Sequence, residues 1–392
     1  MELKTINTLD KKAQDNQNPA DERDLHPYKK FINFRPKRVV RNNFLAFISG
    51  VLLAFSMPGH NLSFLAWVGF IPLLTLIDKS YTYKDSFIAS LCFGFGFNML
   101  VLNWICGLHP LTWMGITSTQ SILLALTVWI SVSAFCSVST GFFGIITKFI
   151  FQTHLSSVIK SLLISCSWIF TSNIVMTYFM GAFSFPWTMI EYSQYKNLPL
   201  LQYAQFIDGI GLGFFIMFIN AILATWVGFK SGKNSIKLNK TKLLIIISTI
   251  IIVHAGGHLL LKTNKTTDPD FKATIIQSNV HIEDEKGRIN SLKNVKRFYY
   301  KLFYNAPEGL IIVPETAIVD YIRFQDKKFY SDLINLAATQ NKTLIVGTLD
   351  SNKKGDVIYP TNSVITFDKA IKNPEKYIYD KHYLVPFGEF FP

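Results

Sequence analysis

Long apolar segments alternate with short polar connections over the first two thirds of the chain. Seven apolar runs occupy residues 43–58, 62–77, 86–108, 119–147, 158–180, 207–229 and 243–261. A helix needs about 20 apolar residues to cross a bilayer, and the third to seventh runs approach or exceed that length. The pattern therefore predicts a polytopic α-helical membrane domain.

The first two runs are short for spanning helices. They fit either two tilted spans or a helical hairpin closed by the turn at residues 57–61. We favour spans because of the charges in the connections, since basic residues accumulate in cytoplasmic loops. With the N terminus inside, the predicted inner connections hold thirteen Lys or Arg residues, and the outer ones, 58–62, 109–118 and 181–206, hold only Lys196. We therefore expect seven spans, which deliver residue 262 onward to the outer side.

The pattern changes after residue 271, where short apolar runs are separated by polar helical stretches. Residues 273–277, 310–313, 343–347 and 362–367 are each typical of a buried strand. Residues 288–304 and 327–340 fit amphipathic helices between them. The sequence thus predicts three parts: a disordered cytoplasmic tail at 1–41, a transmembrane domain at 42–262, and an α/β domain at 263–392.

The positive charge lies mainly in the membrane part. The chain carries 39 Lys and Arg against 26 Asp and Glu, and residues 1–261 hold 20 of the former against 10 of the latter. This excess follows the connections between apolar runs, whereas a nucleic-acid binder gathers basic residues with aromatic ones on a folded face. We therefore expect membrane lipids as partners, and no nucleic acid.

The outer connection at 181–206 is rich in aromatic residues and is interrupted by Pro186 and Pro199. It fits either an interfacial belt at the level of the lipid head groups or a surface-lying segment that lines a lipid-accessible site. In the second interpretation, Phe185, Trp187 and Tyr192 are candidate substrate-binding residues.

Glu315 directly follows the predicted strand 310–313 and Pro314. Side chains at strand ends often carry the chemistry of α/β folds, and a partly desolvated carboxylate there can act as a general base. The alternative is an acid at the N terminus of the next helix.

Lys381 lies in an aromatic stretch near residue 390, eight residues before Glu389. Its ammonium can stabilise an oxyanion in acyl transfer, or it can simply pair with the neighbouring Asp380. Glu389 can orient Lys381, act as a second carboxylate, or be solvated.

Other chemical signals are weaker. His254 and His258 stand one helical turn apart and can share a metal, but Gly256 and Gly257 between them favour helix packing. The glycines at 209–213 open an apolar run and also fit packing. We expect no cofactor and no metal. The four cysteines all lie in apolar segments, where a thiolate is disfavoured.

Five stretches together resemble the apolipoprotein N-acyltransferases, membrane-bound members of the nitrilase superfamily. They are Leu53-Ala-Phe-Ser-Met-Pro, Phe185-Pro-Trp with Tyr192-Ser-Gln, Gln277-Ser-Asn-Val, Val313-Pro-Glu-Thr-Ala, and Tyr379-Asp-Lys-His-Tyr-Leu-Val-Pro-Phe-Gly-Glu. The resemblance implies a nitrilase-like α-β-β-α sandwich in the periplasm, attached to a bacterial inner membrane.

The resemblance also implies a Glu-Lys-Cys triad. Glu315 would be the base, Lys381 the oxyanion-stabilising ammonium, and Glu389 an additional acid. A cysteine thiolate would take an acyl chain from a phospholipid and pass it to the N-terminal cysteine of an apolipoprotein.

In that family the cysteine lies downstream of the lysine motif, so we expect a chain truncated before it. The alternatives are an inactive remnant, one half of a split enzyme, or a membrane-tethered nitrilase-type amidase.

Overall fold

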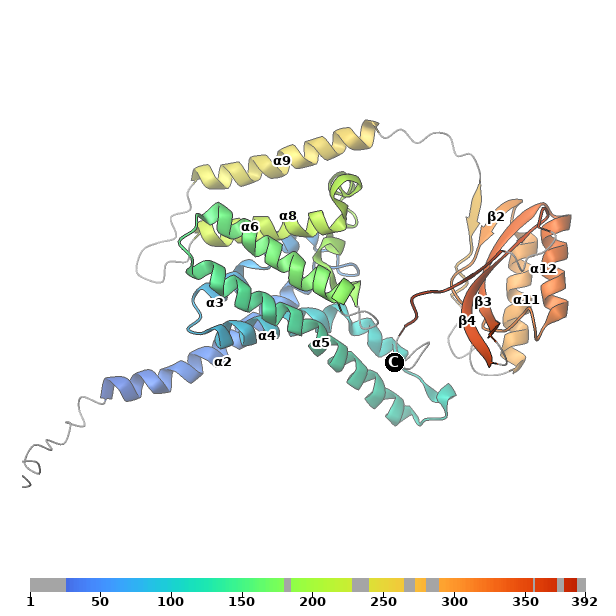
Figure 1. Ribbon diagram of the computed structural model, residues 1–392, viewed down its shortest axis with the longest axis horizontal. Coiled ribbons are helices and arrows are strands. Elements are labelled where there is room, and N and C mark those ends of the chain that lie inside the picture. Colours follow the sequence, from blue (N-terminus) through green and yellow to red (C-terminus); the bar gives the residue numbers. More distant parts are fainter. Residues whose placement is uncertain are drawn as a thin grey trace, which may run out of the picture. The chain divides into compact units, whose positions relative to one another are not determined.

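The computed structural model describes residues 26–179, 185–227, 240–263, 272–279, 289–354, 357–371 and 377–385 (Figure 1). The chain divides into two compact units. The helical unit comprises Met1–Gly107 and Leu126–Lys262, and the sheet unit comprises Leu108–Ala125 and Thr263–Pro392. We describe each unit by itself.

Helices occupy all seven predicted apolar runs. In chain order they are α2 (His26–Ala54), η1 (Ser63–Trp67) with α3 (Ile71–Asp78), α4 (Tyr83–Val101) with η2 (Asn103–Leu108), α5 (Ser118–Gln152), α6 (Ser157–Trp168) with the π-helix η4 (Ile169–Phe179), α8 (Ala204–Val227) and α9 (Lys240–Thr263). The short η3 (Thr112–Met114) precedes α5. Between η4 and α8 lie η6 (Pro186–Thr188), η7 (Ile190–Gln194) and α7 (Leu198–Leu201).

Within the described ranges, four helices are long and apolar enough to cross a membrane. They cover Ser118–Gln152, Ser157–Val175, Ala204–Thr225 and Leu244–Thr263. The second apolar run forms two short helices, η1 and α3, whose combined stretch Ser63–Asp78 is shorter than a standard span. These helices are consistent with a membrane protein, and the count of seven spans stays a prediction.

Helix α2 begins at His26, inside the segment 1–41 that the sequence predicts as a tail, and the division of the chain into three domains stays a prediction. A helix that continues from a packed segment adds residues without a new nucleation step, so the polar stretch before Asn42 extends the apolar run. Residues 1–25 lie outside the described part of the chain.

Close backbone contacts hold α2 against α4. A Cβ on Gly50 would lie 2.0 Å from the carbonyl oxygen of Phe93, and one on Gly96 would lie 2.3 Å from that of Phe47. Only glycine permits such an approach. The N terminus of α4 is fixed by a capping box, in which Thr82 and Asp85 each accept the other's backbone N–H at 3.1 Å.

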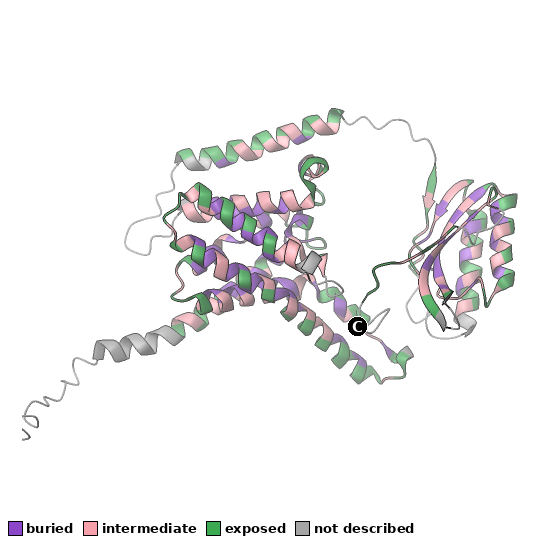
Figure 2. Ribbon diagram, viewed as in Figure 1, coloured by how far each residue is buried: buried purple, intermediate pink, exposed green. Residues whose placement is uncertain are grey.

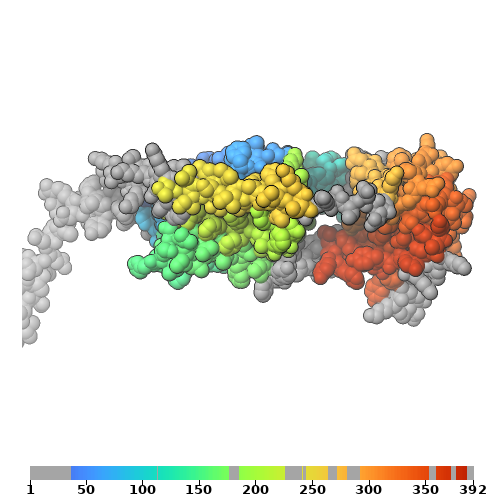
Figure 3. All heavy atoms as spheres, turned by 90° about the horizontal axis from the view of Figure 1, so that it is seen from above, coloured from blue at the N-terminus to red at the C-terminus, as the bar shows by residue number. Residues whose placement is uncertain are grey.

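Helix α9 lies at the surface of the helical unit, and its outer side is uncovered (Figure 3). Only 11% of its apolar stretch, within Leu244–Thr263, is buried. Its glycines provide the close contacts: a Cβ on Gly257 would lie 2.0 Å from the carbonyl oxygen of Pro199. His254 Nε2 lies 3.1 Å from Asn197 Nδ2. This confirms the helix-packing interpretation of the segment around His254 and His258.

The sheet unit contains a five-stranded mixed sheet in the order β1-β2-β3-β4-β5. Strands β1 (Ala273–Ile275), β2 (Gly309–Ile312) and β3 (Lys342–Lys354) run parallel, whereas β4 (Val357–Asp368) and β5 (Ile378–Asp380) pair antiparallel. Helices α11 (Ile289–Asn305) and α12 (Lys327–Thr339) cover one face (Figure 1).

An apolar core lies between these helices and the sheet (Figure 2). Tyr299 and Phe303 of α11 meet Leu333 of α12, and Leu344 and Ile365 contribute from β3 and β4. Both helices are amphipathic because apolar residues recur every three or four positions.

The four predicted strands and both predicted helices are confirmed. β3 and β4 are longer than predicted because the antiparallel pairing of the hairpin continues through residues 348–354 and 357–361. Strand β5 was not predicted.

Candidate active site

Glu315 is positioned by the end of β2. The Val313 N–H donates to the Ile345 carbonyl at 3.1 Å, and the chain leaves the sheet at Pro314. Thr316 then has a φ of 47°, which is incompatible with a helix start. The next helix is α12, which begins at Lys327. The interpretation of Glu315 as a helix N-terminal acid is therefore wrong, and its carboxylate stands on a connecting segment, with 59% of the side chain exposed.

Gly347 of β3 lies directly against this segment. A Cβ there would stand 2.2 Å from the Pro314 carbonyl oxygen, 2.8 Å from the Thr316 nitrogen and 2.9 Å from the Glu315 Cα. All three are backbone atoms, so no side-chain rotation can relieve the clash. The absence of a side chain at Gly347 thus allows the backbone at Glu315 to lie directly against β3.

Lys381 directly follows β5 and reaches Glu315. Its backbone N–H donates to the Asn362 carbonyl at 2.9 Å, and its Nζ donates to Glu315 Oε1 at 2.7 Å. Asn362 Nδ2 donates to the same Oε1 at 2.5 Å. Two residues that are 66 positions apart in the sequence are therefore joined by a hydrogen-bonded ion pair, in which the Lys381 side chain is 26% exposed.

Asp380 has partners other than Lys381. Its Oδ1 accepts from Ser363 Oγ at 2.6 Å, and its Oδ2 accepts from Asn352 Nδ2 at 2.5 Å. Lys381 pairs with Glu315, so the alternative of a simple pair with its neighbour Asp380 does not account for its contacts. These bonds instead fix the backbone that presents Lys381.

The segment after Glu315 is anchored to α11. Lys296 Nζ lies 2.7 Å from Asp320 Oδ2 and 2.5 Å from Asp326 Oδ2. Burial lowers the pKa of Lys296, but the hydrogen bonds and charges of the two carboxylates outweigh it, so the pKa is raised. Thr348 Oγ1 also donates to the Asp320 carbonyl at 2.8 Å. These contacts connect the segment to both a helix and β3.

A second anchor joins Arg323 to β3. Arg323 Nη2 lies 3.1 Å from Asp350 Oδ2, and the Asp350 side chain is only 2% exposed. Burial raises the pKa of Asp350, although the Arg323 guanidinium opposes the shift.

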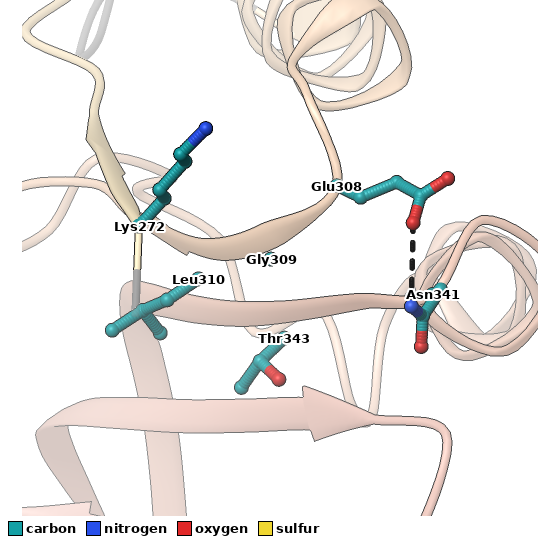
Figure 4. A pocket seen from close by; sticks show the side chains of 6 residues that line it. All are labelled: Lys272, Glu308, Gly309, Leu310, Asn341 and Thr343. Atoms are coloured by element: carbon teal, nitrogen blue, oxygen red, sulfur yellow. Dashed lines mark hydrogen bonds between the residues drawn. The ribbon is translucent and has the colours of Figure 1, made fainter. Parts of the chain in front are cut away.

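One pocket of the sheet unit lies where β2 and β3 begin (Figure 4). Its volume is about 540 Å³. It is lined by Lys272, Glu308, Gly309, Leu310, Asn341 and Thr343. Asn341 Nδ2 donates to Glu308 Oε2 across it at 3.3 Å. These residues stand where β2 and β3 begin, whereas Glu315 follows the end of β2, so we exclude the pocket from the candidate site.

Phe185 and Trp187 lie together in the helical unit. Their ring centroids are 5.2 Å apart, and Trp187 meets Trp104 edge-on at 5.2 Å. Phe185 also packs against Phe135 at 6.0 Å. Tyr192 lies in η7 and is 42% exposed. The aromatic cluster of Phe135, Phe185, Trp187 and Trp104 thus contains two of the three predicted substrate-binding residues.

Glu191, which the sequence analysis did not single out, is buried beside Tyr192. It is 5% exposed, and its Oε1 accepts from Asn173 Nδ2 at 2.8 Å. Burial raises the pKa of Glu191, and the nearby Asp208 adds to the shift. A charged residue in an aromatic connection was the only sequence signal for it. Asn362 and Gly347 were missed as well, because strand residues that orient a distant carboxylate show no periodicity of their own.

Glu389 lies outside the described residues. All four cysteines of the sequence, Cys92, Cys106, Cys136 and Cys166, belong to the helical unit. In the described parts of the chain, no group of three or more His, Cys, Asp or Glu side chains is arranged to hold a metal ion.

The arrangement has the chemistry of a base and a cation. A carboxylate that shares one oxygen with an ammonium and an amide can accept a proton, and the ammonium can stabilise negative charge on a neighbouring oxygen. Both functions serve acyl transfer to or from a nucleophile.

Comparison with known proteins identifies relatives over most of the chain. Residues 49–222 match the family model described as the Apolipoprotein N-acyltransferase N-terminal domain. A protein named Apolipoprotein N-acyltransferase from Geobacter metallireducens is 28% identical over 364 residues, which cover 90% of this chain and 65% of the relative.

Two further proteins of that name give similar values. The one from Synechocystis is 26% identical, over 84% of this chain and 66% of the relative. The one from Pasteurella multocida is 23% identical, over 94% of this chain and 67% of the relative. The chain thus spans about two thirds of the length of the curated relatives it matches. These matches confirm the resemblance to the apolipoprotein N-acyltransferases, and the family model matches residues 49–222 of the chain.

Proposed function

We propose that this chain is the acyl-transfer part of a phospholipid-dependent N-acyltransferase that acylates the N-terminal cysteine of apolipoproteins. The ion pair between Lys381 Nζ and Glu315 Oε1, at 2.7 Å, is the observation that carries the proposal. The names of the relatives support the reaction class. Glu315 and Lys381 are 66 positions apart, so their contact is made by the fold and not by proximity in the sequence. Both residues also belong to the stretches that resemble the family.

In the proposed reaction, Glu315 takes the proton of a cysteine thiol. The thiolate attacks the carbonyl carbon of a phospholipid ester, and the Lys381 ammonium stabilises the resulting oxyanion. The C–O bond breaks, the proton on Glu315 passes to the departing lysophospholipid oxygen, and a thioester remains.

In the second half-reaction, the α-amino group of the apolipoprotein cysteine attacks the thioester. The C–S bond breaks, an amide forms, and the amine proton returns to the thiolate by way of Glu315. Glu389, which the family resemblance assigns as an additional acid, would assist beside Lys381.

We propose that the nucleophilic thiol is none of the four cysteines of this sequence. All four belong to the helical unit, within or next to predicted spans. Replacing all four with Ala should then leave acyl transfer in the protein as the cell makes it within about twofold of wild type. A complete loss traced to any one of them would identify that cysteine as the nucleophile and contradict the proposal.

We also propose the topology predicted from the loops: seven spans in a bacterial inner membrane, a cytoplasmic N terminus, and residues 263–392 as part of a nitrilase-like domain in the periplasm. The uneven distribution of basic residues supports it. Single cysteines introduced at Lys79 and at Lys196 in a cysteine-free variant test it. An impermeant maleimide added to spheroplasts should label position 196 and leave position 79 unlabelled. The reverse pattern would contradict this topology.

Phospholipid would enter beside the aromatic cluster of Phe135, Phe185, Trp187 and Trp104, with Tyr192 close by in the sequence. The partly exposed indole rings of Trp104 and Trp187 support this, because indole rings favour the level of the lipid head groups. If Trp187→Ala together with Tyr192→Ala leaves formation of the acyl intermediate unchanged, this entry route is wrong.

The central experiment uses membranes that contain the protein as the cell makes it. They receive phosphatidylethanolamine with an alkyne-labelled acyl chain and a diacylglyceryl lipopeptide, and mass spectrometry measures amide-linked label. We expect transfer in the wild type, and a loss of at least about 100-fold in Glu315→Gln and in Lys381→Met.

An exposed lysine elsewhere provides the control. Lys369→Met removes a cation in the same unit, whose Nζ donates to Asn341 Oδ1, and should leave transfer unchanged. Cleavage of small amides without lipopeptide acylation would favour a tethered amidase and refute the N-acyltransferase.

A further inference from the structure

A second pocket of the sheet unit lies beside the β3–β4 hairpin. Its volume is about 710 Å³, within the range of small-ligand sites. Tyr321, Arg323, Phe324 and Gln325 of the connecting segment line one side, and Ser351, Asn352 and Pro360 of the β3–β4 hairpin line the other. We call it the hairpin pocket.

One wall of the hairpin pocket is continuous with the candidate active site. Pro360 and Asn362 are two residues apart on β4, so their side chains share a face and their Cα atoms lie about 7 Å apart. Asn362 donates to Glu315. A ligand in the pocket would therefore lie one or two extended residues from the pair.

The charges around the pocket favour a peptide over a phosphate. Arg323 is the only cation among the lining residues that the structure describes, and its charge is matched by the buried Asp350 at 3.1 Å. The neighbouring pair is balanced in the same way, because the Lys381 ammonium lies 2.7 Å from the Glu315 carboxylate. A phospholipid phosphate requires an excess of cations, whereas a peptide backbone carries no net charge.

The lining also suits a peptide backbone. Phe324 is 48% exposed and its ring lies 4.3 Å from the Arg323 guanidinium carbon, which stiffens both side chains. Gln325, Ser351 and Asn352 offer amide and hydroxyl groups that bind the N–H and C=O groups of an extended chain. Aromatic and Arg side chains, as at Phe324 and Arg323, are enriched at protein interfaces.

We infer that the hairpin pocket binds the acceptor peptide, namely the two or three residues that follow the cysteine whose amine is acylated. This inference rests on the proposed function, because only an acyl transfer to a peptide amine gives the pocket such a ligand. It assigns donor and acceptor to different parts of the chain: the acyl donor enters from the helical unit, and the peptide is held by the sheet unit.

The test compares two fluorescent probes on the full chain in detergent micelles. One is a four-residue peptide whose N-terminal cysteine carries S-diacylglycerol, and the other is S-diacylglyceryl cysteine amide without further residues. Fluorescence anisotropy gives their dissociation constants. Phe324→Ala and Gln325→Ala should each raise the dissociation constant of the peptide probe by about 5-fold, the loss typical of one contact at the centre of an interface. Neither variant should change the affinity for the probe without a peptide.

Phe298→Ala is the matched control. Phe298 is 43% exposed and lies on α11, away from the lining of the pocket. The Phe298→Ala variant therefore removes a phenyl ring from the same unit without changing the pocket. It should bind both probes as the wild type does. Equal thermal midpoints of the Phe298 and Phe324 variants ensure that a change in affinity is not a change in folding.

The outcomes separate the inference from the proposed function. If both probes bind the wild type equally and Phe324→Ala alters neither, the hairpin pocket does not bind the peptide, although the proposed function stands. If Phe324→Ala weakens binding of labelled phosphatidylethanolamine instead, the pocket belongs to the donor. If the wild type binds neither probe, both the proposed function and the inference fail.

Discussion

Replacing Gly347 with Ala should lower the rate of acyl transfer strongly while the protein still folds. The added Cβ would stand 2.2 Å from the Pro314 carbonyl oxygen, whereas ordinary contacts begin at 3.4 Å. The segment that carries Glu315 must therefore move away from β3 by about 1 Å. A misplacement of that size costs about 100-fold in rate when a catalytic group is involved.

The stability cost of the same variant should be moderate. Forcing one extra methyl group into a packed site costs about 1–3 kcal/mol. Part of that strain is relieved because Glu315 lies at the surface and can move outward. We therefore expect Gly347→Ala to fold, with a thermal midpoint lowered by several degrees.

The assay pairs acyl transfer with hydrogen exchange. The N–H groups of Val313 and Ile318 donate to Ile345 and Gly347 at 3.1 Å, so their exchange should accelerate in Gly347→Ala as the segment moves. Ile365→Val is the stability control, since it removes a core methylene from β4, beneath α12, at a cost of about 1 kcal/mol.

Gly347→Ala should lose about 100-fold in transfer while Ile365→Val loses less than twofold. Equal transfer in the two variants would refute the view that Gly347 sets the position of Glu315.

Three further predictions concern buried charges: thermal unfolding monitored by circular dichroism tests the first two, and hydrogen exchange tests the second and third. Because burial raises the folded-state pKa of Glu191, its protonated form is favoured, and stability is lost as the pH rises from about 4.5 through that pKa. Glu191→Gln should therefore be as stable as the wild type at pH 4 and more stable at pH 8, whereas a constant difference at all pH values would contradict this assignment. Lys296→Met leaves the Asp320 carboxylate without its partner and should cost about 1–3 kcal/mol at neutral pH, with faster exchange across residues 314–326. Lys342→Met removes the hydrogen bonds from Nζ to the Phe303 and Tyr304 carbonyls at 2.7 and 2.9 Å. The amide hydrogens in the last turn of α11 should therefore exchange faster with solvent, while those of the strands should not.

Much of the sheet unit follows from its sequence pattern. The strands at 310–313 and 343–347 are continuous apolar runs bounded by Gly309 and Asn341, and α11 and α12 repeat apolar residues with a helical period. Strand β5 escapes this reasoning because it has only three residues, and its place beside β4 depends on pairing across the sheet rather than on composition.

The candidate site shows the same division. The type and order of Glu315 and Lys381 were visible as motifs, and their chemistry was predictable from residue type. Their contact was not, because it depends on the register between β4 and β5 and on the space that Gly347 leaves. In the helical unit, the buried Glu191 went unpredicted because burial of a carboxylate reflects tertiary packing alone.

The way Lys381 is held makes the site sensitive to local unfolding. Its backbone is tied to the sheet by β5, a strand of three residues at the edge, while Glu315 stands on segments anchored to the core. Short edge strands open more readily than the rest of a sheet. Each opening would withdraw the ammonium and leave the carboxylate in place, so the fraction of competent molecules would be set by the docking equilibrium of one strand. Any partner that pairs with β5 would raise that fraction without contacting either catalytic side chain.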